Sequence, residues 1–222
     1  MLIPMHEPSI SPLGDPPTVR LMTRDGAFRQ TVRQQLEAAG YQVHDSGSCK
    51  QLMTAGTGCG AGCVVFDIDH SEDRQDLSNF LARCAEGQAV IAAASCPGAL
   101  DVVCAMKAGA SDFILKPADE TILGDAIGAA IARDLARLRN RSQVATLMVR
   151  YGSLTTRERE VALLVGAGLQ NKEIGKAIGV AERTVKAYRA TAMEKMAAHA
   201  LPDLVRALGR LRVDIPEAHG WA

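Results

Sequence analysis

The sequence lacks the features of a protein that enters or crosses a membrane. Its 222 residues contain no run of 18 apolar residues, the length that indicates a membrane-spanning helix. The first 17 residues hold five prolines, and no basic start precedes an apolar core there, as it would in a signal peptide. We therefore expect residues 1–17 to be a disordered tail, and the protein to be soluble and cytoplasmic, without a membrane partner.

Signatures of metal, nucleotide and catalytic sites are also missing. None of the six cysteines forms a C-x-x-C pair, and the five histidines are scattered, with no metal ligand, nucleophile or acid at a telling spacing. The glycine-rich run G-T-G-C-G-A-G-C matches neither a Walker motif nor a dinucleotide fingerprint. We therefore expect no enzyme activity, no metal and no cofactor. Buried reduced thiols are expected, and a redox role for Cys59 and Cys63 is the alternative.

A formal net charge of zero hides an asymmetry along the chain. Residues 1–149 carry 13 Lys and Arg against 17 Asp and Glu, a net charge of −4. Residues 150–222 carry 12 against 8, a net charge of +4. The length suits two domains. A basic C-terminal domain beside an acidic one indicates that the C-terminal domain binds DNA.

The C-terminal segment from Leu154 to Leu208 predicts four helices. Thr155 stands three residues before Glu158, which is a capping box for a helix that starts near Thr156. A short helix is expected over about 171–178, a glycine turn at 179, a longer helix over about 182–196, and a last helix over 202–211. A short helix, a turn and a long helix with early basic residues form a helix-turn-helix, whose second helix enters the major groove.

Four motifs in this segment resemble the LuxR/FixJ class of DNA-binding domains. They read L-T-T-R-E-R-E-V-A, G-L-Q-N-K-E-I-G, A-E-R-T-V-K-A-Y and M-E-K-M, with Thr156 for the usual proline, Gln170 and Ala181 for the usual serine caps, and Tyr188 for the usual histidine. The resemblance implies phosphate contacts from Lys172 and Thr184. It places the other DNA-binding positions, which face base edges or the backbone, at Arg183, Val185, Lys186, Tyr188 and Arg189.

The N-terminal domain alternates apolar runs with amphipathic helices. This pattern predicts a doubly wound parallel (βα)5 sheet over residues 18–133. Asp67 ends the third run and Lys116 ends the fifth. Together with M-K-A-G-A-S-D-F-I-L-K-P, they resemble the receiver domain of two-component response regulators. The resemblance implies that Asp67 is the phosphoacceptor, that Lys116 pairs with its phosphate, and that a histidine kinase or another regulatory protein is a partner.

Two receiver positions depart from the family pattern. The acidic pair that normally ends the first strand is Thr23-Arg24, and the Ser/Thr that ends the fourth strand is Ala94, with Ser95 one residue on. A guanidinium opposes Mg²⁺ binding. We therefore expect Arg24 to pair with Asp67 in a receiver that does not use normal Mg²⁺-dependent phosphorylation.

The loop after the third strand carries two further acids, which bear on the same question. Asp69 and Glu72 follow Asp67 closely and could restore a metal site, although solvated loop carboxylates are more common. A conventional response regulator activated by aspartyl phosphorylation is therefore the alternative. A ligand- or redox-sensing module with secondary DNA binding is the alternative from another class.

The expected fold class is α/β plus all-α. A helical linker is expected over 134–150, a four-helix helix-turn-helix domain over 151–214 and a tail over 215–222. Along the linker, six residues recur at alternating spacings of four and three, which suggests a heptad seam. The seam either pairs with a second copy or packs on its own receiver. It comprises Ile131, Leu135, Leu138, Ser142, Ala145 and Val149. A homodimer is also expected through the last helix, at Leu204, Val205, Leu208 and Leu211.

Overall fold

The computed structural model describes residues 16–54, 61–69, 71–83 and 88–213. The chain divides into two compact units, residues 1–138 and 139–222, and this division lies inside the expected linker. Among the described helices, none has the length and apolar character needed to span a bilayer.

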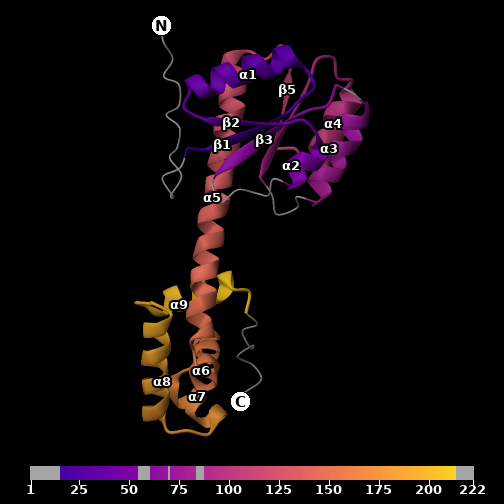
Figure 1. Ribbon diagram of the computed structural model, residues 1–222. Helices are drawn as coiled ribbons and strands as arrows, with labels where there is room; N and C mark the ends of the chain where they lie inside the picture. Colours follow the sequence, from indigo (N-terminus) through magenta and orange to yellow (C-terminus); the bar gives the residue numbers. More distant parts are fainter. Residues whose placement is uncertain (1–15, 55–60, 70, 84–87, 214–222) are drawn as a thin grey trace. The chain divides into compact units, whose positions relative to one another are not determined.

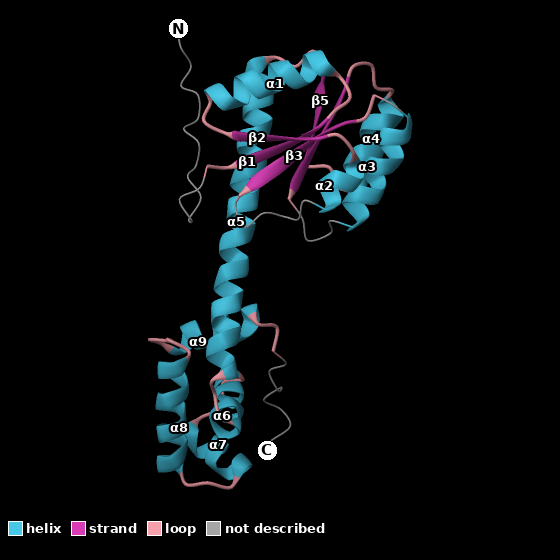
Figure 2. Ribbon diagram, viewed as in Figure 1, coloured by secondary structure: helices cyan, strands magenta, loops and turns pink. Residues whose placement is uncertain are grey.

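The first unit is built on five parallel strands (Figures 1 and 2). They are β1 (Thr18–Met22), β2 (Gln42–Ser46), β3 (Gly62–Asp67), β4 (Ala89–Ala94) and β5 (Asp112–Leu115), in the order β2-β1-β3-β4-β5. The expected doubly wound sheet is confirmed. Every residue of β3 is buried, as a central strand covered on both faces requires.

Helices cover both faces of this sheet. They are α1 (Gly26–Ala38), α2 (Cys49–Thr54), α3 (Ser71–Arg83), α4 (Ala99–Ala108) and the first part of α5 (Glu120–Gly152). Side chains alternate along each strand, so neighbouring residues enter different cores. Val65 of β3 packs in the core that α1 and α5 share, whereas Phe66 packs in the core that contains residues of α2, α3 and α4.

Helix α5 is continuous over 33 residues and includes the expected linker. Ile131 and Leu135 are buried in the receiver core, so this part of the expected seam packs on its own receiver. Further along, Leu147 and Tyr151 pack against the core of the second unit, whereas Val149 is 76% exposed. The seam is therefore not a single free face along the helix.

The second unit contains α6 (Thr156–Gly166), α7 (Asn171–Ile178), α8 (Glu182–Lys195) and α9 (Leu201–Arg210). The expected capping box is confirmed, because Thr155 N donates to Glu158 Oε2 at 2.8 Å and Glu158 N donates to Thr155 Oγ1 at 3.3 Å. Gly179 ends α7 with φ of 70°, a left-handed conformation that favours glycine.

The expected dimer stripe on α9 is wrong at two of its four positions. Leu204 and Leu208 have no exposed surface and lie in the core of the second unit. Leu211 is half-buried against the same core, and Val205 is 38% exposed. A short amphipathic helix must cover its own domain core first, so its strongest apolar positions face inward.

Candidate functional site

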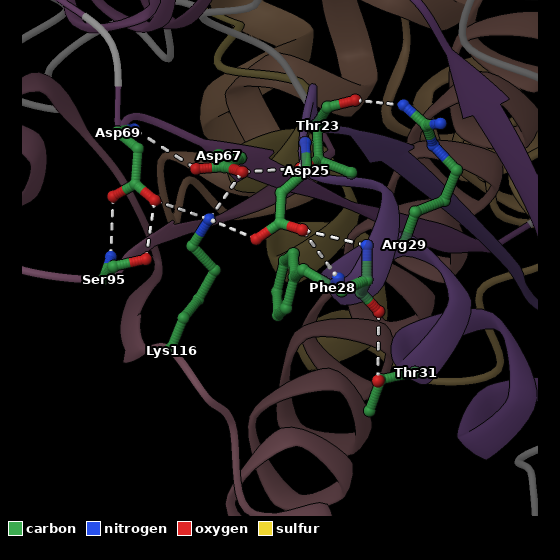
Figure 3. A network of polar contacts seen from close by, with 10 residues as sticks. Thr23, Asp25, Phe28, Arg29, Thr31, Asp67, Asp69, Ser95 and Lys116 are labelled. Carbon is green, nitrogen blue, oxygen red and sulfur yellow. Dashed lines mark hydrogen bonds and ion pairs between the residues drawn. The ribbon is translucent and has the colours of Figure 1, made fainter.

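The receiver site lies at the carboxyl ends of β1, β3 and β5, where parallel strands bring their last residues to one edge (Figure 3). Asp67 ends β3, Thr23 follows β1 and Lys116 follows β5. Lys116 Nζ lies 2.8 Å from Asp67 Oδ2, and the Thr23 hydroxyl donates to the same oxygen at 2.5 Å. All three residues are buried. The structure therefore places Asp67 and Lys116, the two residues expected to handle phosphate, in direct contact.

The Lys116 ammonium is shared by three carboxylates. Besides Asp67, its Nζ lies 2.6 Å from Asp69 Oδ2 and 3.6 Å from Asp25 Oδ2. It also lies 5.0 Å from the centre of the Phe28 ring, within the range of a cation–π contact. Burial disfavours the charged ammonium, but the bonds to Asp67 and Asp69 outweigh burial and raise the pKa of Lys116. The ammonium therefore stays charged at neutral pH.

Asp69 connects Lys116 to the segment after β4. Ser95 N donates to Asp69 Oδ1 at 2.6 Å, and the Ser95 hydroxyl donates to Asp69 Oδ2 at 2.7 Å. Burial opposes ionisation of Asp69, but the bonds from Lys116 and Ser95 outweigh it and lower the pKa of this carboxyl. Asp69 is exposed, as expected of a loop carboxylate, but both of its carboxylate oxygens also bind protein donors. Glu72 cannot be assigned a contact, since its side chain lies outside the described residues.

Asp25 has a structural role at the start of α1. Its Oδ1 accepts from Ala27 N at 2.9 Å and from Phe28 N at 3.0 Å, which caps the helix. The bond from Phe28 is the largest cause of the lowered pKa of Asp25, opposed by burial and assisted by Lys116. Asp25 thus joins the helix cap to the buried ammonium.

The expected ion pair between Arg24 and Asp67 is wrong. Asp25 N donates to Thr23 Oγ1 at 3.0 Å, so the chain turns immediately after β1. Thr23 remains buried in this turn and Arg24 lies exposed. Lys116 therefore provides the cation that pairs with Asp67.

The receiver family implies Mg²⁺ at this edge, but the donors do not fit it. Asp67 Oδ1 accepts from Asp69 N at 3.2 Å, so every oxygen of Asp25, Asp67 and Asp69 has a partner, and the three carboxylates converge on Lys116. The residue at the metal-binding end of β1 is Thr23, whose hydroxyl donates to Asp67. Over the described ranges, no group of three His, Cys, Asp or Glu side chains is arranged to hold a metal ion.

The candidate DNA interface is formed by α7, the Gly179 turn and α8. Lys172, Arg183 and Lys186 are exposed, as a phosphate or base contact requires. Three further expected DNA-binding residues are half-buried: Thr184, Tyr188 and Arg189. Val185 is completely buried in the domain core, so its expected contact with bases is wrong. Val185 and Ala192 lie seven residues apart on the inward face of α8.

Two basic side chains of α8 have partners within the same unit. Arg189 Nη1 donates to Asn171 Oδ1 at 3.4 Å, and Asn171 is the first residue of α7. Lys186 Nζ lies 3.0 Å from Glu182 Oε1, one turn earlier on α8, and both side chains are largely exposed. Sequence reasoning missed Asn171. Its place beside Lys172 in the G-L-Q-N-K-E-I-G motif was the available signal.

A partly buried ion pair links α8 to α6. Lys195 Nζ lies 2.6 Å from Glu158 Oε2, the same oxygen that completes the capping box of α6. The bond from Lys195 is the largest cause of the lowered pKa of Glu158, followed by the bond from Thr155. The pair therefore links the C-terminal end of α8 to the first turn of α6.

The cysteines are only partly as expected. Cys49 and Cys63 are buried thiols, and burial raises the pKa of Cys63 to about 12, so it is unreactive at neutral pH. Cys96 and Cys104 are exposed, contrary to expectation. Cys59, the other member of the suggested redox pair, lies outside the described residues.

Comparisons with known proteins agree with both halves of this arrangement. Residues 152–208 match the family of bacterial regulatory proteins of the luxR type. The transcriptional regulatory protein FixJ of Azorhizobium caulinodans is 34% identical over 190 residues, which cover 85% of this chain and 90% of FixJ. The tetrathionate response regulatory protein TtrR of Salmonella typhimurium is 32% identical over 85% of this chain and 90% of its own length.

Solved structures show the same two-part architecture. The response regulator StyR superposes with a TM-score of 0.74 at 30% identity, over 87% of this chain and 98% of StyR. Full-length FixJ from B. japonicum gives a TM-score of 0.52 at 29% identity, over 89% of this chain and 98% of that protein.

Proposed function

The chain belongs to the FixJ-like response regulators, transcriptional regulators with a LuxR-type DNA-binding domain, and we propose that it binds double-stranded DNA as a homodimer without phosphorylation of its receiver. In this proposal the exposed basic residues of α7 and α8 contact DNA in the cytoplasm. The receiver holds one arrangement that permits this binding.

One observation carries the phosphate-independent part of the proposal. The Lys116 ammonium, whose side chain is 4% exposed, already binds Asp67 and Asp69 and lies near Asp25. A phosphoryl group on Asp67 would have to displace these contacts in order to reach the ammonium. Mg²⁺ would also have to compete with this ammonium for the carboxylates of Asp25, Asp67 and Asp69.

DNA recognition is proposed to follow helix-turn-helix geometry. The N-terminal half of α8 enters the major groove, where Arg183 and Lys186 are free of the domain core. Lys172 at the start of α7 binds phosphate. Two copies would read two half-sites about one helical turn or less apart.

A conventional phosphorylated regulator is the second candidate. It is favoured by the placement of Asp67 beside Lys116 and by relatives whose names describe response regulation. A histidine kinase would then be a partner. No contact among the described residues favours the ligand- or redox-sensing candidate, which we do not propose.

Beryllofluoride separates the first two candidates, because it mimics an aspartyl phosphate and requires a divalent metal in the same pocket. Light scattering on the full-length protein, with and without Mg²⁺ and beryllofluoride, is expected to give the same mass. A shift from monomer to dimer that Asp67→Asn abolishes would show that the receiver is a conventional one.

A further inference from the structure

We infer that the Asp69 carboxylate takes the place of an aspartyl phosphate in this receiver, because it joins Lys116 to Ser95 across the ends of three strands. The inference rests on the proposed phosphate-independent function. It assigns a regulatory role to Asp69, in addition to the roles expected of Asp67 and Lys116.

A phosphoryl group attached to Asp67 would need two kinds of partner. Its anionic oxygens would bind an ammonium on one side and N–H or O–H donors on the other. Lys116 supplies the ammonium and Ser95 supplies both a backbone N–H and a hydroxyl. The Asp69 carboxylate already receives all three donors.

Local structure explains how Asp69 reaches this position. Asp69 N donates to Asp67 Oδ1 at 3.2 Å, so the chain folds back directly after β3. Figure 3 shows the Asp69 carboxylate beside that of Asp67, with Lys116 between them and Ser95 on the far side. Two oxygens of one carboxylate accept from one serine, and this paired geometry fixes the orientation of both residues.

The surrounding backbone holds Ser95 in register with the site. Ile68 N donates to Ala93 O at 2.8 Å, and Lys116 N donates to Ala94 O at 2.8 Å. Backbone hydrogen bonds therefore hold the end of β4 from both sides, through the residues that follow β3 and β5. At this edge of the sheet, the side chain of Asp69 forms the polar link from Lys116 to Ser95.

The link determines how α4 begins. The segment after Ser95 leads to Gly98, the N-cap of α4, and α4 exposes three apolar side chains: Leu100 at 78%, Val103 at 46% and Met106 at 43%. A contact that holds Ser95 thus holds the start of the helix that carries this apolar surface. Asp69 would supply permanently what phosphorylation supplies only when a donor is present.

The test compares full-length variants without a phosphodonor. Asp69→Ala removes the carboxylate, Asp69→Asn keeps its shape without its charge, and Ser95→Ala removes one of the two donors. Asp125→Ala is the matched control, since Asp125 is an exposed acid on α5 away from the site. The probe is a DNA duplex that the unmodified protein selects from a random-sequence pool, and the second readout is the amide signal of Ser95 in a nitrogen-15 NMR spectrum.

Both Asp69 variants are expected to move the Ser95 amide signal and to lower DNA affinity by about fivefold or more, the lower range of coupling between distant sites. Ser95→Ala should lower affinity less, and Asp125→Ala should match the unmodified protein. Wild-type affinity together with an unmoved Ser95 signal in Asp69→Asn would overturn the inference, as would an equal loss in Asp125→Ala. If the unmodified protein selects no duplex, the proposed function fails, and the Ser95 signal still decides whether Asp69 binds Ser95.

Discussion

Asn171 and Glu182 each bind a basic side chain of α8 within the protein itself. Asn171 accepts from Arg189, and Glu182 pairs with Lys186 on the exposed surface. The hydrogen bond to Asn171 restrains the half-buried guanidinium of Arg189, which would lower the entropy lost if this side chain contacts a base. The exposed pair to Glu182 is worth little and breaks easily.

Removal of the Asn171 side-chain amide should therefore weaken specific binding more than non-specific binding. Lys186→Ala and Arg189→Ala should each cost roughly 1–3 kcal/mol of binding free energy if they contact bases. Asn171→Ala should cost less and relax discrimination at the base that Arg189 reads. Gel shifts with the selected duplex and with point-changed duplexes measure both effects, and Lys107→Ala on exposed α4 is the control. Unchanged affinity in both Lys186→Ala and Arg189→Ala, with folding intact, would remove α8 from the groove.

The receiver site also makes a prediction about pH. The pKa of Asp69 is lowered, so the stabilisation from its bonds is present above the ordinary value of 3.8 and is lost as pH falls through the lower folded value. The pKa of Lys116 is raised, so its contribution is present below 10.5 and is lost as pH rises through the higher folded value. The Ser95 amide signal should therefore stay constant between pH 5 and about 9. A transition near neutral pH would contradict this account.

At the scale of elements, local chemistry in the sequence was sufficient for most boundaries. The Thr155–Glu158 box starts α6, Gly179 ends α7, and the apolar runs correspond to the five strands. The direction in which apolar side chains point was harder to predict than the boundaries, because an apolar stripe has the same spacing whether it packs on its own core or on a partner. This ambiguity explains the errors at Leu204 and Leu208.

Contacts between distant segments were the least predictable part of the site. Asp69 and Ser95 are 26 residues apart, and only the register of β3 beside β4 brings them together. Sequence reasoning named Asp69 and Ser95 without pairing them, and it expected Arg24 to form the ion pair with Asp67 that Lys116 forms in the structure. A turn that exposes one side chain and buries its neighbour is set by hydrogen bonds that composition does not reveal.

The burial pattern of α9 can be tested by stability. Leu204→Ala should lower the free energy of unfolding of the second unit by about 2–5 kcal/mol, because it leaves a cavity in a closed core. Val205→Ala on the exposed side should stay within about 0.5 kcal/mol. Urea unfolding followed by circular dichroism measures the difference. Equal stability of the two variants would mean that Leu204 is not a core residue.

The whole molecule separates its charge between the two compact units. Residues 1–138 carry 11 Lys and Arg against 17 Asp and Glu, and residues 139–222 carry 14 against 8, so the net charges are −6 and +6. This division is sharper than the one expected from a boundary at residue 149. A basic unit that binds phosphates releases counterions, so binding must weaken as salt rises.

The salt dependence should report how many phosphates the basic unit contacts. Each neutralised phosphate adds roughly −0.9 to the slope of log affinity against log salt concentration. Lys172→Ala should reduce the magnitude of this slope by about one and weaken all duplexes alike, because a phosphate contact carries no sequence information. Fluorescence anisotropy at several salt concentrations gives the slope. A selective loss for one duplex sequence would instead assign Lys172 to base recognition.

The most direct measurement of phosphate-independent DNA binding is affinity before and after attempted phosphorylation. The full-length protein is incubated with acetyl phosphate and Mg²⁺, assayed on a Phos-tag gel, and titrated against the selected duplex in the same samples. Because Lys116 is already bound by Asp67 and Asp69, we predict no shifted band and an unchanged affinity. A shifted band with an affinity gain of about tenfold, equal to 1.4 kcal/mol, that Asp67→Asn abolishes would contradict the account.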